Sequence, residues 1–230
     1  MTRAALWVGI SLVLPGLLGA EPAPAAKNAE ITSDRLQIQK SGEETLFRGN
    51  VLLKQVEQWI EADEMTRYRL TGIAEARGHV RGTWFSPGGE KIIGRGDKAR
   101  YAPLAQTTDL WGKHPYATLT RWETAIDTMP VVMHALHFTA KQQENIVLAH
   151  ANVIILQTPR FEGRSDEARY NRTDGTLEMW GHNHKQVQIH LNDRKGSGDF
   201  LADKAWMVLS PRKARLTGRV TGHVIPSTES

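Results

Sequence analysis

The sequence predicts an all-β, antiparallel fold built from tandem units of two strands each. Three observations support this: a small residue followed by Asp recurs along the chain, a glycine follows it at a constant distance, and apolar and polar residues alternate around both. Alternation with a period of two places the apolar residues on one face of a strand, whereas in an α-helix they would point to all sides. The recurrence predicts six such units.

The N-terminal segment predicts export. Residues 1–20 combine Arg3, an apolar run broken by Pro15, and small residues ending at Ala20. This is the pattern of a signal peptide, cleaved after Ala20 or after Ala26. A retained membrane anchor is the alternative, although the apolar run is shorter than the roughly 20 residues of a spanning helix. The expected organisation is a signal peptide (1–20), a Pro/Ala-rich leader (21–28), one repeat domain (29–226) and a short tail (227–230).

The cysteine content and the net charge exclude some classes of binding site. The chain has no cysteine, so disulfides and thiolate metal sites are excluded, and stability must come from packing and strand pairing. The formal net charge of +4 is spread thinly over 230 residues. A diffuse positive charge does not indicate nucleic-acid binding, but it is compatible with an anionic lipid head group.

Each predicted unit starts at a small residue followed by Asp, which we call its anchor. Five anchors are regular: Ser33-Asp34, Ala62-Asp63, Gly96-Asp97, Ser165-Asp166 and Ala202-Asp203. A sixth, degenerate anchor is placed at Met133-His134. Fifteen residues after each anchor Asp stands a glycine: Gly49, Gly78, Gly112, Gly181 and Gly218. In the degenerate unit Ala151 takes that place, and turn-forming residues separate the two strands of most units.

The anchors predict corners in the sheet. Apolar residues lie three positions before the anchor Asp but two and four positions after it, so the inward phase shifts by one residue. A bulge or corner produces such a shift, and Asp can accept hydrogen bonds from backbone N–H groups that a corner leaves unpaired. We therefore expect the aspartates to cap corners and not to act in catalysis. The irregular stretch between Gly112 and Met133, which contains Pro115 and Pro130, predicts a break or a crossover.

The motifs resemble those of the OstA-like family of lipopolysaccharide transport proteins. Phe47-Arg48-Gly49-Asn50-Val51, Ile60 to Met65 and Ala76 to Val80 carry the resemblance, together with Ile31-Thr32-Ser33-Asp34. It is strongest over residues 29–112 and continues more weakly to about residue 224. Within this superfamily of LptA, LptC and LptD N-terminal domains, the chain is most similar to the soluble periplasmic LptA-like members.

The resemblance implies a twisted, V-shaped β-jelly roll whose apolar interior holds the acyl chains of lipopolysaccharide. It also implies a periplasmic location, no cofactor, and inner-membrane and outer-membrane partners with domains of the same type. End-to-end stacking of copies is a further implication, since a repeat sheet has unpaired edges at its first and last units.

The strand periodicity gives a set of candidate groove residues on the inward phase, and Trp84 is added from the connection between two units. They are Ile31, Leu36, Ile38, Phe47, Val51, Ile60, Met65, Trp84, Tyr101, Leu110, Leu136, Phe138, Val153, Tyr170, Met179, Leu216 and Val220.

Three other functions remain as alternatives. A membrane-anchored LptC-like component would retain the N-terminal segment. A structural β-repeat protein would have a filled core and no ligand. A carbohydrate-active enzyme would need acidic residues outside the repeat, and the acids here recur with it. A metal site at His182, His184 and His190 is disfavoured, because His182 occupies the polar repeat position after the glycine. The tryptophans stack on sugars, line the mouth of an apolar cavity, or pack in the core.

Overall fold

The structure, a computed structural model, describes residues 30–55, 58–85, 90–113, 116–122, 129–193, 196–208 and 213–227. These residues form one antiparallel sheet of eighteen strands and a short 3-10 turn, η1 (Lys40–Gly42). The predicted all-β class is therefore confirmed. No helix in the described ranges is long and apolar enough to cross a membrane. The predicted signal peptide and leader, as well as Pro115, lie outside the described residues.

Six long strands run the full width of the folded sheet: β3 (Glu44–Gln55), β4 (Gln58–Tyr68), β5 (Ala74–Phe85), β6 (Lys91–Ala102), β11 (Ile146–Gln157) and β12 (Phe161–Asn171). The other strands are shorter and each covers half of that width: β1 (Glu30–Thr32), β2 (Arg35–Gln39), β7 (Thr107–Trp111), β8 (Ala117–Trp122), β9 (Val131–Ala135), β10 (His137–Lys141), β13 (Thr176–Trp180), β14 (Val187–Asp193), β15 (Gly196–Ala202), β16 (Lys204–Val208), β17 (Lys213–Thr217) and β18 (Thr221–Pro226).

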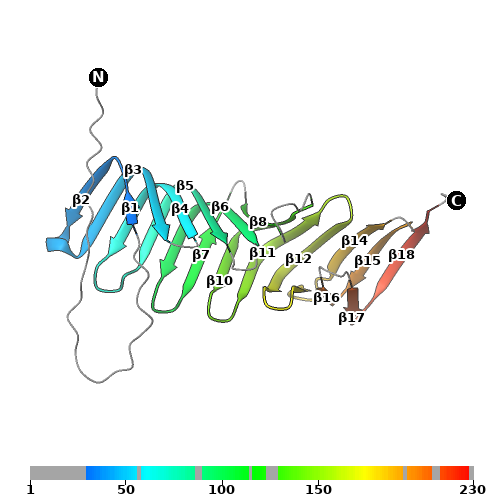
Figure 1. Ribbon diagram of the computed structural model, residues 1–230. Helices are drawn as coiled ribbons and strands as arrows, with labels where there is room; N and C mark the ends of the chain where they lie inside the picture. Colours follow the sequence, from blue (N-terminus) through cyan, green and yellow to red (C-terminus); the bar gives the residue numbers. More distant parts are fainter. Residues whose placement is uncertain are drawn as a thin grey trace.

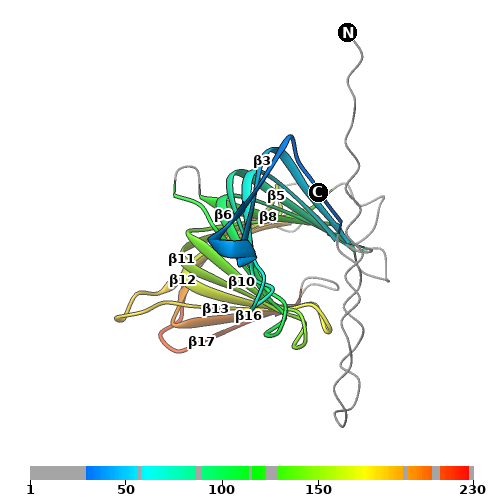
Figure 2. The same cartoon turned by 90° about the vertical axis from the view of Figure 1, so that its left-hand side faces the viewer.

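The sheet is folded over into two layers. The first layer contains β2, β7, β10, β13, β16 and β17 with one half of each long strand. The second layer contains β1, β8, β9, β14, β15 and β18 with the other half. Seen end-on, the layers are inclined to each other (Figure 2). The layers therefore enclose a space between their inner faces, which we call the interior.

The short strands are long strands interrupted at the corner. β7 and β8, for example, pair with the two halves of β6, and β9 and β10 pair with the two halves of β11. Counted this way, the described residues form the six predicted two-strand units, which follow one another along the length of the molecule (Figure 1). Of the irregular stretch before Met133, the part between β7 and β8 is a break at the corner, and β8 then pairs directly with β9, so the described residues contain no crossover there. The jelly-roll part of the expectation stays a prediction.

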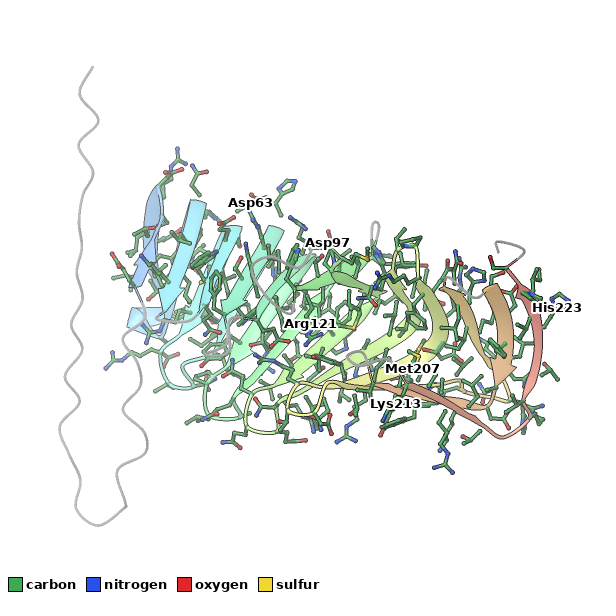
Figure 3. All side chains as sticks on the ribbon, turned by 45° about the vertical axis from the view of Figure 1, so that its right-hand side comes forward. Asp63, Asp97, Arg121, Met207, Lys213 and His223 are labelled. Atoms are coloured by element: carbon green, nitrogen blue, oxygen red, sulfur yellow. The ribbon has the colours of Figure 1, made fainter. Side chains whose placement is uncertain are left out.

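The predicted corners are confirmed. In the long strands the pairing register shifts at Arg48/Val51, Glu61/Glu64, Arg77/Val80 and His150/Val153. Figure 3 shows Asp63 and Asp97 on the same edge of the molecule. An extra residue in one strand of a pair bends that strand, and a bend repeated in every strand at the same height folds the whole sheet.

The anchor aspartates accept hydrogen bonds at these corners. Asp97 accepts from the backbone N–H of Lys113 at 2.9 Å, and Asp166 accepts from that of His182 at 2.8 Å. Asp203 accepts from the backbone N–H of Arg219 at 3.0 Å and also from its guanidinium. In the first two units a side chain takes this part: Asn50 Nδ2 donates to Asp34, and His79 Nδ1 lies 2.8 Å from Asp63.

The anchor predicted at Met133-His134 is wrong by two residues. Both lie inside β9, which ends at Ala135, and the corner falls at Leu136, whose backbone N–H donates to the carbonyl of Ala151. Ala135-Leu136 is therefore the degenerate anchor, and the spacing to Ala151 becomes the same fifteen residues as in the other units. This unit has no Asp, so only the apolar alternation marks its anchor. The alternation does not distinguish Met133-His134 from Ala135-Leu136, because the two pairs are two residues apart.

Glycine is required opposite the corner aspartates. Gly78 has φ +70°, a left-handed conformation that disfavours other residues, and a Cβ there would collide with the Asp63 side chain. We expect Gly78→Ala to lower the free energy of unfolding by about 3 kcal/mol, from the strained φ and the collision together. Gly175 is a matched control, because its φ is +68° but a Cβ would meet nothing within 4 Å. Gly175→Ala should cost only about 1 kcal/mol; equal losses in urea unfolding would contradict the corner packing.

Acid should weaken the corners. The hydrogen bond from the His182 backbone, together with the nearby Lys185 ammonium, holds the pKa of Asp166 below its usual 3.8. A carboxyl whose pKa is lower in the folded state stabilises the fold above its unfolded pKa, and this stabilisation is lost as the pH falls through the folded pKa. Asp166→Asn should therefore be less stable than the native chain at pH 7, and the difference should shrink below pH 3.8. Thermal unfolding at both pH values measures this; a difference that does not change with pH would contradict it.

Candidate functional site

The interior is the candidate site, and it contains more than half of the predicted groove residues. Nine of these side chains belong to one buried apolar cluster that both layers share: Phe47, Val51, Ile60, Met65, Leu110, Phe138, Val153, Tyr170 and Met179. The cluster extends along the chain as far as Met207. Strand alternation directs these side chains to the same side, and the corners turn the two inner faces toward each other.

Three further groove residues, Ile31, Trp84 and Leu216, are partly buried against that cluster. The sequence placed Trp84 in a connection, but it lies within β5, on the inner face. Its indole covers Gly82, where a Cβ would collide with the ring, and a Cβ on Gly94 would lie only 3.1 Å from the same ring. The two glycines therefore provide the room for a large aromatic side chain in the interior.

The remaining five groove residues do not join the buried cluster. Leu36, Ile38 and Val220 are 48%, 65% and 47% exposed. Tyr101 is half-buried on the inner face, where burial raises the pKa of its hydroxyl. Leu136 is half-buried at the corner of its unit. Inward-facing apolar side chains are therefore buried at some positions along the molecule and exposed to water at others.

The interior is filled in the middle and open at its ends. Ile155 and Val187 in the middle are completely buried. Leu36 and Ile38 face the interior from β2, but β2 is the last strand of the first layer and β1 opposite it has only three residues. At the other end Val224 of β18 is 60% exposed. The apolar inner face thus reaches both ends of the sheet, where water contacts it.

Charged residues on the inner face were missed by the sequence reasoning. Arg121 follows Ala117 and Leu119 on the inward phase of β8 and is only 9% exposed. It pairs with Glu90, which also contacts Arg172 from the other layer. The signal in the sequence was a charged residue that continues the inward alternation of an apolar strand.

A family model matches part of this structure. Residues 30–129 match the LptA/LptD N-terminal domain family of lipopolysaccharide (LPS) transport proteins. Over this segment, which is less than half of the chain, the chain is similar to that family. The family is one of transport proteins and not of enzymes. The matched segment contains β1 to β8, and the same pairing pattern continues beyond it to β18.

A solved structure and the curated sequences were also compared. The crystal structure of LptH, the LptA homologous periplasmic component of the lipopolysaccharide transport device from Pseudomonas aeruginosa, aligns with 73% of this chain and 96% of that chain. The sequence identity is 11% and the TM-score is 0.38. The resemblance to the family therefore depends on the sequence match over residues 30–129. No curated protein sequence matches the chain.

Most of the described tryptophans lie outside the interior. By strand alternation Trp59, Trp111, Trp122, Trp180 and Trp206 occupy outward positions, and Trp84 alone of the described tryptophans faces inward. Trp59 contacts Phe85 at 5.1 Å between ring centroids, and Trp111 stacks on His137 at 4.8 Å. Core packing, one of the expectations from the sequence, does not describe these five side chains, and stacking on sugars stays a prediction.

The outward histidines pair with carboxylates. Burial acts to raise the pKa of Asp109, but hydrogen bonds from His137 and Thr139 outweigh it and hold the pKa below its usual range. His182 lies 3.3 Å from Glu167, and His190 lies 2.8 Å from Asp199. In the part of the chain that the structure describes, no group of three or more such side chains is arranged to hold a metal ion.

The filled middle and the open end should respond differently to truncation. Ile155→Ala removes buried methyl groups and leaves a cavity, so the free energy of unfolding should fall by about 3 kcal/mol. Ile38→Ala, the same change at a 65% exposed position, should cost less than about 1 kcal/mol. Chemical unfolding of both variants measures the difference, and a small loss for Ile155→Ala would show that the middle of the interior is not packed.

Proposed function

We propose that this chain is a periplasmic LPS-binding transport protein. In this proposal its interior shields the acyl chains of lipid A from water and helps to bridge the inner and outer membranes. One observation carries the proposal: a chain whose residues 30–129 match a family of LPS transport proteins folds its sheet over an apolar inner face that is still exposed at both ends, at Ile38 and Val224. An exposed apolar surface of this kind marks a binding site for apolar groups.

Acyl chains gain free energy by leaving water for the interior, and this gain favours separation of the layers. Burying a methylene group contributes about 0.8 kcal/mol, so one chain of ordinary length contributes on the order of 10 kcal/mol. Among the described residues, backbone pairing joins the layers along the corners, whereas only side chains join them along the opposite edge, so they can move apart there without breaking strand pairs. In this proposal the chains enter at the exposed ends and replace side-chain contacts in the middle. The groove residues listed above are the proposed contacts.

The edges of the sheet support the proposed partners. β2 and β1 end the two layers at one end, and β17 and β18 end them at the other. Their outer backbone groups are available for pairing with another strand. Inner-membrane and outer-membrane components with domains of the same type, or a second copy of this chain, are the proposed neighbours. Sequencing the mature N-terminus separates a soluble bridge, which begins at Glu21 or Lys27, from an anchored component, which keeps Met1.

A second function is favoured by the packed middle of the interior. A structural β-repeat protein needs a filled core and carries no ligand, and Val51, Ile155 and Val187 are packed in that way. Native mass spectrometry after gentle extraction distinguishes the two functions. A transport protein should retain a lipid with the mass of LPS or lipid A, and a structural protein should retain none.

Photo-crosslinking tests the proposed route of the lipid. A photoreactive residue at Ile38 or Val224, which face inward at opposite ends, should capture LPS in cells. The matched controls are the neighbouring outward positions Gln37 and His223, which are exposed and should capture much less. Capture at Phe138, which is 2% exposed, should require lipid to have entered between the layers. Capture from the outward positions alone would overturn the proposal.

A further inference from the structure

Two arginines and a glutamate join the layers on the side opposite the corners. Glu90 immediately precedes β6, and Arg121 lies next to it near the end of β8, both in the second layer. Tyr170 near the end of β12 and Arg172 just after it belong to the first layer. All four occupy inward positions by strand alternation, and Figure 3 places Arg121 near the middle of the molecule. We call these four residues the clasp.

The clasp is centred on the Glu90 carboxylate. Arg121 Nε donates to Glu90 Oε1 from the same layer. Arg172 donates to Glu90 Oε2 from the opposite layer, through Nε at 3.2 Å and Nη2 at 3.1 Å. The Tyr170 hydroxyl lies 3.5 Å from Glu90 Oε1, and the Arg121 guanidinium lies 5.0 Å from the Tyr170 ring centroid. These contacts span the interior at the edge where the layers are not joined by backbone.

Burying the charges of the clasp in an apolar interior costs free energy of desolvation. The side chains of Arg121 and Glu90 are 10% and 12% exposed, so both charges have lost most of their water. Desolvation offsets much of the attraction in such a pair, and apolar residues of similar size often stabilise a fold as well or better. Stability alone therefore gives a weak reason for these residues. Two guanidiniums converging on one carboxylate also form the arrangement that binds a phosphate group, through charge-assisted hydrogen bonds.

We propose that Arg121 and Arg172 form a binding site for the phosphate group of a phosphorylated lipid, and that Glu90 occupies this site when no lipid is bound. The proposal rests on the proposed function, because it supplies the polar contact for a lipid whose acyl chains lie in the interior. Phosphate oxygens accept the hydrogen bonds that Glu90 now accepts. When the lipid phosphate replaces Glu90, the ion pair between Glu90 and Arg172 that links the layers is broken. Binding of the head group and opening of the interior are therefore coupled.

The test compares two probes on the purified mature chain: lipid A with its phosphates, and the same lipid after enzymatic dephosphorylation. Glu90→Gln removes the internal competitor, so it should bind phosphorylated lipid A about tenfold more tightly. Arg172→Gln should bind it about tenfold more weakly, and Arg172→Lys should restore part of the loss. None of these variants should change affinity for the dephosphorylated lipid. A gain of affinity in Glu90→Gln cannot result from misfolding, and circular dichroism checks the fold of each variant.

Arg164→Gln is the matched control. Arg164 pairs with Glu162 at 2.7 Å on the outer face, so the control removes a guanidinium from an ion pair without touching the interior. It should leave the affinity for both lipids unchanged. An equal effect of Arg164→Gln and Arg172→Gln would show that net charge, and not the clasp, governs binding.

The outcomes separate this site from the proposed function. If the native chain binds neither lipid, the transport function and the clasp proposal both fail. If it binds both lipids equally, and the clasp variants change nothing, lipid carriage stands and the phosphate site is overturned. Inorganic phosphate is the third probe: competition at the same concentration as lipid A would show a site for free phosphate and overturn the lipid-borne source.

Discussion

The bend in every strand at the same height is the constraint on which the rest of the structure depends. A flat meander of twelve strand-length segments would leave one apolar face in water. The register shift at each corner turns the two halves of that face toward each other, and Asp97, Asp166 and Asp203 satisfy backbone N–H groups that the bend leaves unpaired. Gly49, Gly78 and Gly218, at positive φ, leave space for the aspartates opposite them. The corner is thus a packed, hydrogen-bonded structural motif that recurs along the molecule.

Folding one sheet over itself makes an interior whose two long sides differ. The corner side is continuous backbone, whereas the opposite side holds the layers together through side chains. The ends also differ from the middle, because a repeat can bury its apolar face only against neighbours on both sides and the terminal units lack one neighbour. The exposure of Ile38 and Val224 follows directly from this geometry. An elongated interior that is packed centrally and uncovered at its ends suits a protein that works in series with similar domains.

The clasp is the place where this fold departs from the rule that a folded-over sheet encloses apolar residues. Arg121 continues the alternation of Ala117 and Leu119, yet it brings a charge to a nearly dry position. Glu90 and Arg172 come from segments far apart in the sequence, and only the closed arrangement brings them to one point. A polar link at the open side has fewer contacts than a strand pair, and in the proposal it opens when a lipid phosphate replaces Glu90.

The sequence by itself determined the strands, their alternation, the six units and the corner at each small–Asp step, because these depend on residues close together in the chain. It also indicated the family, through short motifs that recur in register. It misplaced the fourth corner, since Leu136 replaces the Asp that marks the others, and it assigned Trp84 to the connection between two units, although Trp84 lies within β5. Only the tertiary structure decided which inward residues are packed and which are exposed, and that Arg121 and Arg172 meet on Glu90. Burial and ion pairing across the interior depend on how far the two layers close, and that is a property of the whole folded sheet and not of any one strand.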